Sequence, residues 1–242
     1  APLAASRAEV EQAAAALAGP SRLELADDAT EAAVRELAPA PPRVLHLATH
    51  ALTDERLAEG AALLLTPAGE DDGLLTASEI AALDLPVDLA VLAACRSALG
   101  SAHDGRALSS LTGAFLAAGA GGVVASLWEV GDATSAIFMT ELYRELGAGV
   151  RPVEALARVK RRLRADPRWA DPSVWGAFVL IGDPAPVAAA RARWLVPALL
   201  SAIALAALAL FLRYRAGSRR SSSSGEAASS APPASNASTR TR

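Results

Sequence analysis

Short apolar runs that alternate with helical segments are the sequence feature that most limits how this chain can fold. Four of these runs have the length and composition of buried strands: 44–50, 89–95, 123–128 and 175–181. Helical segments precede or separate them: 5–18, 28–37, 108–118, 134–146 and 152–164. Strands that alternate with helices form βαβ units. The pattern therefore predicts an α/β domain over residues 1–186, with a largely parallel sheet and helices on both of its faces.

Two reactive side chains stand at the ends of the first two runs. His50 ends the run 44–50, and Cys95, the only cysteine among 242 residues, ends the run 89–95. The carboxyl ends of parallel strands meet at one edge of a sheet, so His50 and Cys95 should lie close together. A thiol becomes a good nucleophile beside a base, and a lone cysteine with a histidine about 50 residues upstream is typical of caspase-type peptidases. The alternative interpretation is that Cys95 is a small buried apolar side chain.

The other two histidines have simpler interpretations. His46 lies four residues before His50 on the same face of the predicted strand, and we interpret it as a core histidine with satisfied hydrogen bonds. His103 lies in a loop of small residues after Cys95, where we expect it to be solvated, with a role as general base as the alternative. Three scattered histidines and one cysteine cannot form a structural zinc site. We therefore expect no metal and no cofactor.

The composition excludes two further classes of protein. A net charge of −3 gives no indication of nucleic-acid binding. A single cysteine excludes an intrachain disulfide. The chain begins at Ala1 and its only methionine is Met139, so we expect it to be a fragment or a processed product that lacks upstream sequence.

Several ordered motifs carry a resemblance to a known family. They are HLATH at 46–50, LAACRS at 92–97, AFLAAGA at 114–120, ASLWEVGD at 125–132 and WGAFVLIG at 175–182. With these motifs the chain resembles the CHAT family of caspase-fold cysteine peptidases, which are relatives of separase. The resemblance extends over roughly residues 5–184 and implies a caspase-like fold. It also implies a protein partner, since members of the family are often joined to upstream helical repeats that sense one.

The resemblance implies a role for each reactive group. Cys95 would be the nucleophile that attacks a peptide carbonyl, and His50 the general base that later protonates the leaving amine. The backbone N–H groups of Ala51 and Cys95 would hold the oxyanion. The chain departs from the family at Ala51, where glycine is common, and at Arg96-Ser97, where Glu-Thr is common. If the loop requires a positive φ, alanine costs about 1 kcal/mol more than glycine there.

Acidic residues that follow the run 123–128 are candidates for substrate binding. Asp132 should reach the catalytic edge, and by resemblance to separase it would line the pocket for the residue before the cut bond. A carboxylate at that point would favour arginine or lysine. Glu129 is a further candidate for this pocket. The alternative role for Asp132 is to cap the 134–146 helix.

A membrane anchor is predicted beyond the α/β domain. After a linker at 187–193, residues 194–212 carry no charge and lie between Arg193 and Arg213. Such a stretch can span a bilayer core of about 30 Å, although a buried core helix is an alternative. The residues 213–242 form a basic, serine-rich tail that we expect to be disordered. The arginines after the span favour a cytoplasmic tail, which would place the α/β domain on the outer side of the membrane. A free thiol, however, persists best in the reducing cytoplasm, and we therefore place the α/β domain there.

Taken together, these observations predict a single-pass membrane-anchored cysteine endopeptidase with a dyad of His50 and Cys95. It would cleave a protein partner in regulated proteolysis, after a basic residue. Two alternatives stay open. The domain could be a catalytically silent CHAT-fold scaffold in a signalling protein, or an acyl-transfer enzyme that acts on a thioester or on an amide other than a peptide.

Overall fold

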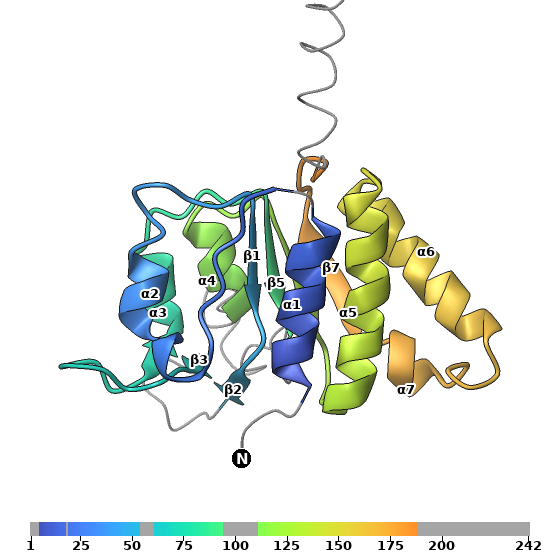
Figure 1. Ribbon diagram of the computed structural model, residues 1–242, viewed down its shortest axis with the longest axis horizontal. Coiled ribbons are helices and arrows are strands. Elements are labelled where there is room, and N and C mark those ends of the chain that lie inside the picture. Colours follow the sequence, from blue (N-terminus) through green and yellow to red (C-terminus); the bar gives the residue numbers. More distant parts are fainter. Residues whose placement is uncertain (1–4, 18, 54–60, 94–110, 188–242) are drawn as a thin grey trace, which may run out of the picture. The chain divides into compact units, whose positions relative to one another are not determined.

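The computed structural model describes residues 5–17, 19–53, 61–93 and 111–187 (Figure 1). The chain separates into two compact units, Ala1–Ala192 and Arg193–Arg242, and all of the described residues belong to the first. Within the described residues, no helix has the length and apolar character needed to cross a membrane. The predicted span 194–212 and the predicted tail 213–242 lie outside the described residues.

Four strands form the main sheet, in the order β1-β5-β6-β7. They are β1 (Val44–Leu47), β5 (Leu89–Leu92), β6 (Gly122–Ser126) and β7 (Phe178–Gly182). Neighbours β1, β5 and β6 are parallel, and β7 runs antiparallel to β6. A largely parallel sheet is therefore confirmed. The last strand is reversed because two long helices, α5 (Asp132–Gly147) and α6 (Pro152–Ala165), lie between it and β6, and each of them runs the chain once along the sheet.

A second, smaller sheet follows β1 and is antiparallel throughout. Its strands β2 (His50–Thr53), β3 (Ala61–Leu64) and β4 (Leu74–Thr76) lie in sequence order. The predicted single strand 44–50 is therefore wrong in its extent. Pairing between β1 and β5 ends at Leu47, opposite Leu92, and His50 already pairs with Leu64 in the second sheet. Alternating apolar residues predict extended backbone, but they do not show where one strand ends and the next begins.

Helices cover both faces of the main sheet, as predicted (Figure 1). The remaining helices are α1 (Ser6–Ala16), α2 (Glu31–Arg35), α3 (Ala77–Ala81), α4 (Leu111–Ala117) and α7 (Pro172–Trp175), with a short 3₁₀ turn at Ala26–Asp28. Alternate side chains of β5 pack into two separate hydrophobic cores, one on each face of the main sheet. Leu89 and Val91 pack with residues of α1, α5 and α6, whereas Ala90 and Leu92 pack with residues of α2, α3 and α4. Both faces of β5 are thus apolar because both are covered.

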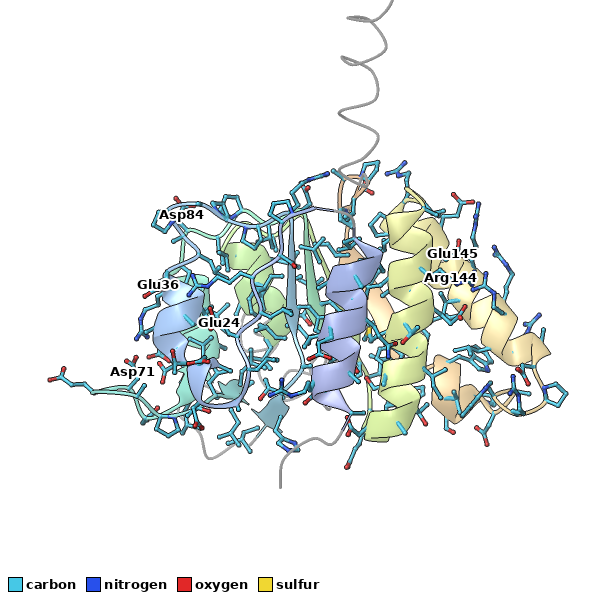
Figure 2. All side chains as sticks on the ribbon, in the orientation of Figure 1. Glu24, Glu36, Asp71, Asp84, Arg144 and Glu145 are labelled. Carbon is cyan, nitrogen blue, oxygen red and sulfur yellow. The ribbon has the colours of Figure 1, made fainter. Side chains whose placement is uncertain are left out.

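An ionic cluster joins α5 to α6. Glu145, which Figure 2 labels together with Arg144, is buried and accepts hydrogen bonds from Arg162 at 2.6 Å and Arg158 at 3.3 Å. The hydrogen bond from Arg162 is the main reason that the pKa of Glu145 lies below its ordinary value. Burial of this carboxylate is therefore compensated by charged partners on the neighbouring helix, which fixes α6 against α5.

Candidate active site

A pocket lies where strands of the main sheet end. The chain that follows β1 contributes Ala48, Thr49 and His50, the chain that follows β5 contributes Ala93, and β6 contributes Ser126. The rest of the lining comes from α1, from β7, from the start of α5 and from the connection that precedes it: Ser6, Glu9, Val130, Asp132, Ser135 and Phe178. Segments far apart in the sequence therefore meet at the carboxyl edge of the parallel strands, which is where ligand sites of open α/β sheets occur.

His50 reaches this pocket through the turn that joins the two sheets. It is the first residue of β2, it is half-buried, and it pairs with Leu64 of β3. The hydroxyl of the preceding residue, Thr49, donates a hydrogen bond to the carbonyl oxygen of Leu64. This bond and the strand pairing hold the backbone on either side of His50 in place, so the imidazole is attached to an ordered part of the fold.

Cys95 lies outside the described residues, and so does His103. The approach to Cys95 is described as far as Ala93, which lines the pocket with His50. The backbone N–H of Ala93 donates to the carbonyl oxygen of Leu47 at 3.0 Å. The segment that leads to the cysteine is therefore bonded to the end of β1, three residues before His50 in the sequence.

Ala51 occupies an ordinary strand position. It pairs with Leu63 and packs against the core beneath the second sheet. Among the described residues, Ala26 is the only non-glycine residue with a positive φ. The backbone at Ala51 therefore does not need a glycine, and the departure from the family at this position carries no penalty from a left-handed conformation.

Asp132 lines the pocket, whereas Glu129 is exposed and is not part of the lining. The helix α5 begins at Asp132, its N-cap is Gly131, and no side chain caps it. The capping role considered for Asp132 is therefore wrong. Its Oδ2 atom instead accepts a hydrogen bond of 2.7 Å from the backbone N–H of Ala5, at the start of α1. A carboxylate in the first turn is also favoured by the helix dipole.

A buried polar network lies beneath the pocket. The His46 ring lies 2.8 Å from the Tyr143 hydroxyl through Nδ1 and 2.9 Å from Oε1 of Glu9 through Nε2. Glu9 itself is 3% exposed. Burial, together with the negative charge of Glu9, holds the pKa of Tyr143 well above its ordinary value of 10, so the hydroxyl stays protonated. The interpretation of His46 as a satisfied core histidine is confirmed.

Sequence reasoning missed Glu9, which is the second carboxylate of the pocket beside Asp132. Its position four residues before Ala13, the other buried residue of α1, is the one signal in the sequence that could have found it. The described part of the lining contains two carboxylates and His50 but no lysine or arginine, so this part favours a cationic group over an anionic one. The described residues contain no group of three or more metal-binding side chains.

Comparison with known proteins shows which family the sequence matches. The sequence model of the CHAT domain matches residues 1–183. Tetratricopeptide repeat protein 28 of Homo sapiens is 38% identical over 110 residues, which are 46% of this chain and 4% of that protein. The protein of the same name from Mus musculus is 38% identical over 111 residues, with the same two shares. The matched segment is thus a small part of either relative.

Proposed function

The chain belongs to the CHAT domain family, and on that premise we propose that it is a cysteine endopeptidase with His50 as general base and Cys95 as nucleophile. One observation supports the pairing most directly. His50 and Ala93 line the same pocket, and Cys95 follows Ala93 by two positions. Two residues of chain span about 7 Å at most, and this short connection from Ala93 is the support for pairing Cys95 with His50.

The proposed reaction needs only these two side chains, backbone donors and water. His50 takes the proton of the Cys95 thiol, and the thiolate sulfur forms a bond to the peptide carbonyl carbon. Backbone N–H groups of Ala51 and Cys95 stabilise the oxyanion. The C–N bond then breaks while the His50 imidazolium gives its proton to the leaving amine. Water, deprotonated by His50, hydrolyses the thioester and returns the thiol.

We expect the residue before the cut bond to be arginine or lysine. Asp132 of α5 and Glu9 of α1 place two carboxylates in the pocket that contains His50. A guanidinium or ammonium group would form charge-assisted hydrogen bonds with them. Glu9 thus provides the second substrate-binding carboxylate, the role that the sequence suggested for Glu129, which is exposed.

Electrophilic peptides that end in arginine, leucine or aspartate test this function. The arginyl probe should label the chain about tenfold faster than the other two, because one well-formed ionic contact contributes about 1.5 kcal/mol or more. Peptide mapping should place the label on Cys95. Asp132→Asn should remove most of the preference, and Asp183→Asn, at an exposed aspartate far along the sequence, should keep it.

Three results would count against the proposal. Labelling at a residue other than Cys95 would overturn the nucleophile assignment. Equal labelling by the three probes would overturn the basic specificity alone. No labelling by any probe would favour the alternative of a catalytically silent scaffold.

The names of the two matched relatives are in keeping with the expected upstream repeats, because both are tetratricopeptide repeat proteins.

We also propose that residues 194–212 anchor this peptidase in a membrane, with the catalytic domain in the cytoplasm. The support is the uncharged stretch itself, since charged residues first appear at its borders. The chain should stay in the membrane fraction after alkaline extraction. Leu205→Arg with Leu208→Arg should release it, because each central arginine costs about 2.5–3.5 kcal/mol on insertion, whereas Ser222→Arg in the tail should not. Release of the wild-type chain, or cleavage of its α/β domain by protease outside intact cells, would contradict this.

A further inference from the structure

An apolar row crosses the second sheet directly from His50. In the antiparallel register His50 pairs with Leu64, and Leu64 pairs with Leu74 on the next strand. Paired residues point to the same face of a sheet, and so do residues two apart along one strand, which adds Leu52 to this face. We call Leu52, Leu64 and Leu74 the leucine ledge. The ledge and the proposed general base therefore belong to one face of three short strands.

The leucine ledge is not part of the hydrophobic core. Leu52 and Leu64 are each 40% exposed, and Leu74 is half-buried. The opposite face of the same strands holds Leu63 and Leu75, which are fully buried in the core. The leucines on one face of the second sheet are thus part of the core, whereas the leucines on the other face are in contact with water. Grouped apolar side chains that stay exposed mark binding surfaces more often than single ones do.

The chemistry at His50 determines what would lie on this ledge. To protonate the leaving amine, His50 must come within about 3 Å of the amine nitrogen. The residue that follows the cut bond carries that nitrogen, so its side chain must lie next to His50. Side chains of paired residues in an antiparallel sheet have Cβ atoms about 5 Å apart, so Leu64 is within reach of the same substrate residue. None of the three leucines lines the pocket that holds Asp132 and Glu9.

We propose that the leucine ledge binds an apolar side chain of the substrate residue that immediately follows the cut bond. The inference rests on the proposed peptidase function and deepens it. The substrate then has two recognition elements on either side of the cut bond. A basic residue enters the acidic pocket, and an apolar residue lies against Leu64 and Leu52. Such a pairing of a charged and an apolar requirement rejects more sequences than either one alone.

A series of peptides that differ only in the residue X after arginine tests the ledge on the full chain. With X as leucine, kcat/KM should exceed that with serine or aspartate about tenfold, the low end of what an apolar contact of this size gives. Leu64→Glu should reverse the order and favour lysine at X. Such a gain cannot come from misfolding. Leu23→Glu, at a leucine that is 43% exposed outside this sheet, should keep the wild-type order.

The outcomes separate the two proposals. Cleavage with equal kcat/KM for all four residues at X would overturn the leucine ledge and leave the peptidase function standing. Cleavage that prefers leucine in both the wild-type chain and Leu64→Glu would also overturn it, because the preference would then arise elsewhere. A chain that cleaves none of the peptides and takes no label from the arginyl probe would overturn both proposals.

Discussion

Replacement of His50 by alanine is expected to lower kcat/KM for an arginyl peptide by about a thousandfold, within the range that general acid–base catalysis contributes. The reason is that the same imidazole acts twice, first as the base for the Cys95 thiol and then as the acid for the leaving amine. Loss of the ring leaves substrate binding at Asp132 intact, so the change should appear in kcat rather than in KM. Cys95→Ala should abolish turnover altogether.

Two controls separate the loss of a base from the loss of the fold. His103→Ala, at the other histidine considered for this role, should keep kcat/KM within about twofold of wild type, as expected for a solvated side chain. Imidazole added to His50→Ala should restore part of the activity, since a free base can occupy the space that the ring leaves. Activity that survives in His50→Ala and is lost in His103→Ala would transfer the role of base to His103.

The order of the main-sheet strands and of the long helices between them followed from the sequence, because most of these elements have a clear hydrophobic period. The helix predicted at 152–164 is found at Pro152–Ala165, where a proline at the first helical position and regularly spaced Ala155, Val159 and Leu163 mark its start and its buried face. The boundary between β1 and β2, just before His50, could not be predicted, because the two strands follow each other closely in one extended stretch of sequence. The change from one sheet to the other depends on pairing with Leu64, which lies 14 positions further along the chain.

The candidate site was predictable where it depends on strand ends and unpredictable where it depends on packing between helices. His50 and Asp132 were found because each follows a strand of the main sheet. Glu9 was not, because α1 carries little apolar periodicity and its orientation is set by contacts with distant residues. Its carboxylate faces His46, and Thr140 of α5 donates to Gln12 on the same helix at 2.7 Å. The spacing of Glu9 and Ala13 on one face of α1 is the only local signal, and it does not identify these partners.

The buried network beneath the pocket leads to the second large effect. Glu9→Leu is expected to lower the free energy of unfolding by about 3 kcal/mol, because the buried His46 ring would lose its charged partner. The carboxylate now accepts from His46 Nε2, while the Tyr143 hydroxyl contacts Nδ1. Tyr143→Phe removes a single neutral hydrogen bond and should cost about 1–2 kcal/mol. Urea unfolding followed by tryptophan fluorescence measures both changes.

Glu11 provides the matched control on the same helix. It is exposed and pairs with the exposed Arg7, so Glu11→Leu should change the free energy of unfolding by less than about 0.5 kcal/mol. If Glu11→Leu and Glu9→Leu destabilise equally, the cost comes from the leucine on α1 rather than from the network.

A double variant tests whether the stability that Glu9→Leu loses comes from leaving His46 without its partner. When Glu9→Leu is combined with His46→Leu, no buried charge and no buried imidazole remain, and apolar groups of similar volume take their place. Replacing a whole buried polar pair in this way is often neutral, whereas removing one partner is not. The double variant should therefore recover most of the stability that Glu9→Leu loses, although Tyr143 keeps a hydroxyl without His46. Additive losses would mean that Glu9 and His46 stabilise the fold independently of each other.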